Sequence, residues 1–251
     1  MIKLFISDLD GCISHPFESP NWGAISRIKE LVDLSSSDEA IPPMTICSGR
    51  PLPYVEAVSQ WIGMKQPMIF ESGGGIYDMQ SNTLTWNPSF DEAREAELNT
   101  IKAHLTENYI RKIPNTIPEF AKRTDIGLIN PDPAAINGIY ESINEYVENN
   151  FPNFEVHYTD VSINVISKST NKGAGITHLS EMLNLKLDEI AYIGDTSGDI
   201  PALEIVGKSF APKNAKEYVR QICEFPLEKE TTEAVLEAYE WVIDYNRALL
   251  K

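Results

Sequence analysis

The sequence predicts an α/β protein with a doubly wound, mostly parallel sheet and an inserted α+β domain. Near both ends of the chain, apolar strand-like segments alternate with amphipathic helix-like segments, which is the pattern of βα units in a parallel sheet. The middle of the chain has helix-like segments and half-exposed strand-like segments instead, which indicates an insertion. With 251 residues, 42% of them hydrophobic, the chain is long enough for a large core.

The N-terminal part alternates between strand and helix. Residues 2–8 form an apolar run that predicts the first strand, and residues 22–34 carry apolar side chains at helical spacing. A strand is expected over residues 43–47, followed by a helix with Pro51 at its first position, where proline is tolerated. Residues 67–70 predict a further strand, which ends in a glycine-rich turn.

The middle of the chain has a different pattern. Residues 89–107 predict an acidic helix, and Asp132 followed by proline predicts the start of a second helix. Residues 119–130 and 154–166 alternate between apolar and polar side chains, as half-exposed strands do. We therefore expect residues 81–167 to form the inserted α+β domain, with its helices on one face of its sheet.

The C-terminal part returns to the first pattern. Residues 190–193 predict a strand and residues 231–249 a long helix. Residues 1–80 and 168–251 are therefore expected to form one core domain. Ligands of doubly wound sheets bind beyond the carboxyl ends of the strands, and the most polar motifs of this chain lie at those positions.

Composition excludes several classes of function. The formal charge of −16 repels nucleic acid and anionic membranes, so neither is an expected partner. No apolar run is long enough to span a membrane, and the N-terminus does not have the pattern of a signal peptide. The three cysteines are odd in number and far apart, which favours a reducing compartment, and we expect a cytoplasmic protein.

Two aspartates follow the first strand. Asp8 is expected at the strand end and Asp10 two residues later on the same side. A carboxylate at the first position can accept a phosphoryl group as a nucleophile, and one at the second can protonate a leaving alkoxide and then deprotonate water. Gly11 allows a tight turn whose N–H groups can bind phosphoryl oxygens. Alone, the pair would be read as a polar strand end with a capping role.

A hydroxyl group and a lysine follow two other segments. The Ser48 hydroxyl and the N–H of Gly49 suit a phosphoryl oxygen, although Ser48 could also cap the next helix. Lys172 stands at a predicted helix start, where a positive charge opposes the helix dipole unless an anion binds there. We expect both groups to bind the phosphoryl group.

Two further aspartates follow the strand over residues 190–193. Carboxylate and carbonyl oxygens are the ligands that Mg²⁺ prefers. We expect Asp8 and Asp195 to bind Mg²⁺ through carboxylates and Asp10 through its carbonyl. Asp199 is expected to act as a ligand through water or to fix Lys172.

Together these motifs resemble the haloacid dehalogenase superfamily, in which Asp-x-Asp-Gly, a serine or threonine, a lysine and an acidic pair occur in this order. The resemblance covers the whole chain. The α+β insertion between the second and third motifs resembles the cap of the sugar-phosphatase branch, which includes sucrose-phosphate, mannosyl-3-phosphoglycerate and phosphoglycolate phosphatases and phosphomannomutase. It implies a HAD-like Rossmannoid core, Asp8 as nucleophile, Asp10 as general acid and base, and Mg²⁺ as cofactor.

The chain departs from the family pattern at three positions. Cys12 stands where threonine is usual, Ser72 replaces an asparagine in the glycine-rich turn, and Gly198 replaces a frequent asparagine. The last change affects a hydrogen bond near the metal or near Asn214. None removes a proposed catalytic group.

The resemblance implies a Mg²⁺-dependent phosphomonoesterase that acts through an aspartyl-phosphate on a small sugar phosphate or phosphorylated organic acid. The sequence carries no signal for the oligomeric state. Polar side chains on the expected open face of the cap sheet, and some beside the motifs, are candidates for substrate binding: Arg50, Arg123, Asp160, Ser162, Asn164 and Asn214. The alternative for the cap residues is a solvated sheet face.

Two other functions use the same parts. A phosphomutase shares the core but must keep water from the aspartyl-phosphate, so it would form an isomer without free phosphate. A non-enzymatic phospho-acceptor module uses acidic residues, a hydroxyl group and a lysine on a doubly wound sheet. Such modules are about half as long, lack the insertion and do not need Asp10.

Overall fold

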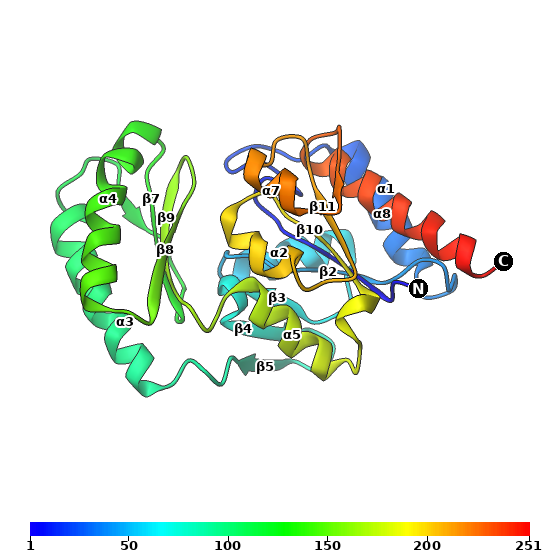
Figure 1. Ribbon diagram of the computed structural model, residues 1–251, viewed down its shortest axis with the longest axis horizontal. Coiled ribbons are helices and arrows are strands. Elements are labelled where there is room, and N and C mark those ends of the chain that lie inside the picture. Colours follow the sequence, from blue (N-terminus) through cyan, green and yellow to red (C-terminus); the bar gives the residue numbers. More distant parts are fainter.

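The computed structural model describes residues 1–251, which form two lobes (Figure 1). The larger lobe contains a parallel five-stranded sheet with the order β12-β11-β10-β1-β2. Its strands are β1 (Leu4–Ser7), β2 (Met44–Ile46), β10 (Ile190–Ile193), β11 (Lys208–Ala211) and β12 (Phe225–Pro226). The chain builds outward from β1 in one direction and from β10 in the other, so the switch point where ligands bind lies between β1 and β10.

Helices cover both faces of this sheet, which confirms the predicted doubly wound fold. Apolar residues of α1 (Trp22–Leu34), α2 (Leu52–Ile62) and α8 (Thr231–Leu249) pack on one face in a cluster of 28 buried residues. The other face is covered by α5 (Lys172–Met182), α6 (Ile200–Leu203) and α7 (Glu217–Ile222). Short 3-10 turns, η3 (Leu187–Glu189) and η4 (Ser197–Asp199), flank β10.

A second, antiparallel sheet extends the core. It contains β3 (Met68–Phe70), β4 (Gly75–Asp78) and β5 (Thr83–Trp86), and β3 joins the edge of the parallel sheet through a bridge between Cys47 and Ile69. The turn η1 (Glu71–Gly73) connects β3 to β4. Because β5 pairs with β4, we propose that the inserted domain begins after Trp86 rather than at residue 81.

The smaller lobe, called the cap below, has its own antiparallel sheet of order β6-β7-β9-β8. The strands are β6 (Ile117–Pro118), β7 (Asp125–Ile129), β8 (Phe154–Tyr158) and β9 (Ser162–Ser167). Two helices, α3 (Glu92–Leu105) and α4 (Pro133–Asn150), pack on one face around 13 buried apolar residues, and a π-helical turn, η2 (Thr106–Ile110), follows α3. In Figure 1 the helices lie on the outer side, so the opposite face of the sheet is turned toward the core.

The strand predicted over residues 119–130 begins only at Asp125. The preceding residues form a loop in which Ala121 has a φ of 63°. A continuous strand over residues 119–130 would pack Phe120 inward and leave Asp125 on the open face. Both expectations are wrong, because Phe120 is 70% exposed and Asp125 is buried. None of the helices combines the length and apolar character that a membrane span requires.

Candidate active site

The first aspartate lies at the carboxyl end of β1, at the switch point. The Asp8 N–H donates to the Ile193 carbonyl of β10 at 2.9 Å, and the residue is buried. Gly11 completes the turn with a φ of +82°, and a Cβ there would lie 2.1 Å from Asp195 Oδ2. Only glycine allows both the left-handed conformation and this close approach.

Lys172 joins two of the aspartates. Its Nζ lies 2.8 Å from Asp8 Oδ1 and 2.6 Å from Asp199 Oδ1, and its side chain is 7% exposed. Burial lowers the pKa of Lys172, but the charges of Asp199 and Asp8 outweigh burial and raise it well above its usual value. The lysine predicted to oppose the helix dipole is therefore fixed between two carboxylates at the first turn of α5.

Burial and like charge raise the pKa of two carboxyl groups here. Burial, and then the nearby Asp199, raise the pKa of Asp8 to about 7, although Lys172 lowers it. The same two causes raise the pKa of Asp195 well above its usual value. The site therefore holds more negative charge than Lys172 alone compensates, which favours the binding of a cation.

Asp199 has no oxygen left for a direct metal contact. Its Oδ1 accepts from Lys172 and from the Tyr192 hydroxyl, and its Oδ2 accepts from two N–H groups and the hydroxyl of Thr196. Burial raises the pKa of Asp199, but Lys172 and these donors hold it below its usual value. Of the two roles predicted for Asp199, this geometry favours the one that fixes Lys172.

Asp8 and Asp195 fit a divalent ion. Asp195 Oδ1 is buried and has no hydrogen-bond partner, which is costly unless a cation or other donor binds it. One ligand atom from each of Asp8, Asp195 and Cys12 lies within 4.8 Å of the others. Burial raises the pKa of the Cys12 thiol well above its usual value, so it stays protonated and Mg²⁺ is left with the oxygen ligands that it prefers.

The second motif lies beside the aspartates. Ser48 is buried, its N–H donates to the Ile69 carbonyl at 3.0 Å, and its hydroxyl accepts from the Arg50 N–H at 3.2 Å. Helix α2 has Pro51 as its N-cap and receives no side-chain cap. The alternative role for Ser48, a helix cap, is therefore not observed, and Ser48 and Gly49 line the same pocket as Asp8.

That pocket lies between core and cap and has a volume of about 110 Å³. Sites for drug-sized ligands measure roughly 300–1,000 Å³, so the pocket suits a small molecule. Both lobes contribute to its lining, which includes Asp8, Asp10, Ser48, Gly49, Arg50, Ser72, Glu119, His157, Tyr158, Thr159, Ser162, Asn164, Lys172 and Ser197.

The structure brings three of the candidate substrate residues into the pocket, namely Arg50, Ser162 and Asn164. The other three have partners elsewhere. Arg123 pairs with Glu95 at 3.2 Å and lies over the Trp86 ring, and Asp160 is an exposed residue 3.7 Å from Lys216. Asn214 donates to the Gly11 carbonyl and accepts from the Thr231 N–H, so it supports the turn after β1.

Three titratable residues are among the polar residues at the interface of the two lobes that sequence reasoning missed. Glu119 and His157 line the pocket, and Lys122 lies directly behind Glu119. His157 Nε2 lies 2.9 Å from Glu155, and its Nδ1 lies 3.4 Å from the Ser197 hydroxyl of the core. The charges at positions 119 and 122 could have suggested an ion pair, but the predicted strand would have placed them on opposite faces.

The chain belongs to the haloacid dehalogenase-like hydrolase family, whose model matches residues 94–238. The match begins within α3 of the cap and includes the third and fourth motifs. It confirms the family that the motifs resemble, together with the predicted core and cap architecture.

Two curated relatives and one solved structure give the level of similarity. Phosphoglycolate phosphatase of Methanosarcina acetivorans is 25% identical over 96% of both chains, and that of Methanopyrus kandleri is 26% identical over 94% of both. The sucrose-phosphatase of Synechocystis, solved with sucrose and phosphate, has a TM-score of 0.67 at 16% identity and covers 96% of this chain and 98% of its own. The family and these relatives confirm the prediction that the chain is a phosphatase.

Proposed function

We propose that the protein is a Mg²⁺-dependent phosphomonoesterase that forms an aspartyl-phosphate on Asp8. The observation that carries this proposal is the position of Asp8, fixed by Lys172 at 2.8 Å in a pocket that Asp10 also lines. A nucleophile, a cation for the phosphoryl oxygens and a second carboxylate thus meet at the switch point of the sheet.

The residues of the site have separate roles in the two steps of ester hydrolysis. Asp8 attacks phosphorus and forms the new P–O bond, while the bond to the leaving oxygen breaks and Asp10 donates a proton to that oxygen. Ser48, the Gly49 N–H and Lys172 bind phosphoryl oxygens. Water then attacks the aspartyl-phosphate, Asp10 takes the water proton, and Asp8 leaves as a free carboxylate. Electrons and protons balance over the two steps.

Asp8, Asp195 and the Asp10 carbonyl would hold Mg²⁺. The bound ion supplies positive charge that offsets the repulsion between the carboxylates and an anionic substrate. The unpartnered Asp195 Oδ1 is the feature of this chain that supports such a site. Three buried, unpaired cysteines support a reducing compartment, and we propose the cytoplasm.

The pocket suggests a small, hydroxylated or carboxylated leaving group. Its cap side presents hydroxyl and amide groups from Thr159, Ser162 and Asn164, and its core side presents the Arg50 guanidinium. The phosphoglycolate phosphatases among the relatives support a small phosphorylated acid, and the sugar phosphatase among the structural neighbours supports a sugar phosphate. We propose a substrate within these two classes.

Phosphate release from a panel of esters tests the proposal. The panel contains glycolate, glycerate, hexose, sucrose and nucleotide monophosphates, each assayed with Mg²⁺ and with chelator. We expect chelator-sensitive release that strongly favours one small ester. If a sugar phosphate is converted to an isomer without free phosphate, the enzyme is a mutase and the proposed hydrolysis is wrong.

A further inference from the structure

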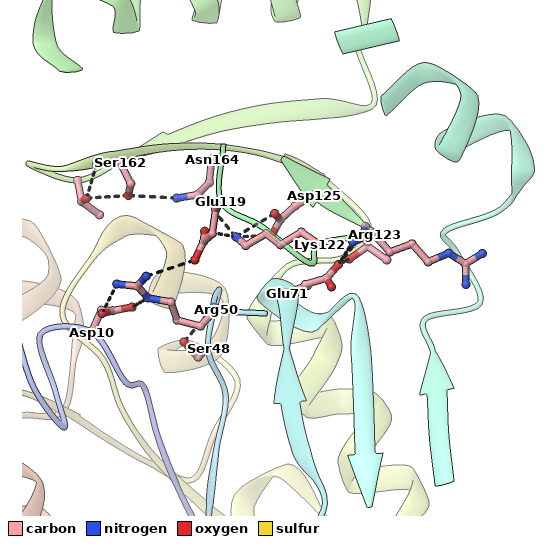
Figure 2. A network of polar contacts seen from close by, with 12 residues as sticks. Asp10, Ser48, Arg50, Glu71, Glu119, Lys122, Arg123, Asp125, Ser162 and Asn164 are labelled. Atoms are coloured by element: carbon pink, nitrogen blue, oxygen red, sulfur yellow. Dashed lines mark hydrogen bonds and ion pairs between the residues drawn. The ribbon is translucent and has the colours of Figure 1, made fainter. Parts of the chain in front are cut away.

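A continuous network of charged side chains connects the cap to Asp10 (Figure 2). Arg50 forms a bidentate contact with Asp10, in which Nε donates to Oδ2 at 2.6 Å and Nη2 donates to Oδ1 at 2.9 Å. The third donor group, Nη1, lies 3.3 Å from Glu119 Oε1 of the cap. Arg50 therefore links a carboxylate of the core to a carboxylate of the cap.

Lys122 fixes the position of Glu119 within the cap. Its Oε2 lies 2.7 Å from Lys122 Nζ, and this ammonium also lies 2.9 Å from Asp125 and 3.2 Å from Asn164 Oδ1. The Lys122 side chain is 2% exposed. A lysine this deeply buried among acceptors has few alternative positions, so Glu119 presents its other oxygen to Arg50 in one defined orientation.

A contact with the core fixes the loop that carries Lys122. Oε2 of Glu71, from the turn η1, accepts from the Arg123 N–H at 2.9 Å, from the Thr124 N–H at 2.6 Å and from the Thr124 hydroxyl at 2.8 Å. Glu71 is buried and has a φ of 48°. This loop of the cap therefore bonds to the core at Glu71 and, through Glu119, at Arg50.

From this geometry we infer that Glu119 is a positioning residue that, through Arg50, holds Asp10 in place to take a proton from the attacking water. The inference rests on the role proposed for Asp10. A carboxylate has about four lone-pair sites, and Arg50 uses two of them, so a site on each oxygen stays free for the water proton. A bidentate arginine contact also fixes the plane of the carboxylate.

The two half-reactions should respond differently when this network is weakened. The contact with Arg50 fixes the orientation of the Asp10 carboxylate, and this orientation matters in the second step, where Asp10 accepts a proton from water. The first step with p-nitrophenyl phosphate needs no proton donor, because nitrophenolate is a good leaving group. Loss of Glu119 should therefore slow hydrolysis of the aspartyl-phosphate and leave its formation from this substrate unchanged.

Glu119→Gln tests the inference because it keeps the size of the side chain and removes its charge. Glu95→Gln is the matched control, since Glu95 is another cap carboxylate paired with an arginine, but on the exposed surface. With p-nitrophenyl phosphate and Mg²⁺, rapid mixing measures nitrophenolate release in the first turnover and in the steady state. Acid quench measures the fraction of enzyme that carries phosphate.

We expect Glu119→Gln to change the first-turnover rate by less than about 2-fold and to lower the steady-state rate about 10-fold. The second effect is smaller than the rate enhancement of a whole general base, because Asp10 itself remains. The phosphorylated fraction should rise, and Glu95→Gln should match the wild type. An equal fall in both rates, or a raised KM alone, would indicate a structural or substrate-binding role and overturn the inference, as would unchanged kinetics. If neither the wild type nor Asp10→Asn ever carries phosphate, the proposed function fails instead.

Discussion

Replacing Lys172 with methionine tests whether the buried charges of the site compensate one another. Methionine keeps much of the volume and removes the ammonium that lies 2.8 Å from Asp8 and 2.6 Å from Asp199. Loss of one partner from a buried ion pair costs about 3–5 kcal/mol. Asp199 retains donors from Tyr192, Asp195 and Thr196, so we expect the lower end, a loss of about 3 kcal/mol in the free energy of unfolding.

This loss should depend on pH in a defined direction. Asp8 has a pKa of about 7 in the folded protein against a usual value of 3.8, so its contribution to stability is present at low pH and is lost as pH rises from about 4 through 7. Without Lys172 the pKa of Asp8 rises further. The cost of the substitution should therefore grow by about 1 kcal/mol between pH 6 and pH 8, since one pKa unit corresponds to about 1.4 kcal/mol.

Urea unfolding in the presence of chelator, at both pH values, measures this effect. Lys208→Met is the control, because Lys208 pairs with Glu224 near the surface at 2.7 Å, and we expect it to cost less than about 1 kcal/mol at either pH. The reasoning is refuted if Lys172→Met costs no more than this control, or costs less at pH 8 than at pH 6.

The remaining predictions concern activity. Asp10→Asn should lower the steady-state rate on alkyl phosphates by about 100-fold or more while Mg²⁺ affinity, measured by calorimetry, stays within a few-fold, because the carbonyl is the expected ligand. Gly11→Ala should abolish chelator-sensitive activity, since its Cβ would displace the Asp195 carboxylate; retained activity would disprove the turn geometry. Arg123→Ala should leave the ranking of substrates unchanged in the ester panel, because its side chain lies outside the pocket. Glu71→Gln should lower the steady-state rate in the same direction as Glu119→Gln but by a smaller factor, and a first-turnover rate that falls as much would argue against transmission through the loop.

The core of the site could be predicted because its residues follow strands. The carboxyl ends of β1, β2 and β10 meet at one edge of the sheet, so Asp8, Ser48 and Asp195 come together once the strands are identified. Helix α1 and strand β10 begin and end at the predicted residues, because their apolar patterns are strong and their ends carry clear signals.

The cap side of the site could not be predicted in the same way. The alternating pattern over residues 119–130 predicts one strand, but the strand begins only at Asp125, and Ala121 in the preceding loop adopts a left-handed conformation that its sequence does not signal. As a result Lys122 enters the interior between Glu119 and Asp125, while Arg123 points to the surface. Contacts with Glu71, 52 and 53 positions earlier in the chain, hold the loop in this form.

The central claim is that Asp8 carries the phosphoryl group during turnover. Acid quench of Asp10→Asn during reaction with p-nitrophenyl phosphate, whose first step needs no proton donor, followed by reduction and peptide mass spectrometry, tests it most directly. We expect a modification at Asp8 whose amount depends on substrate and Mg²⁺ and which is absent from the Asp8→Asn, Asp10→Asn double variant. A phosphoryl group on another residue, or wild-type phosphate release with no protein-bound phosphate in any quench, would contradict the claim.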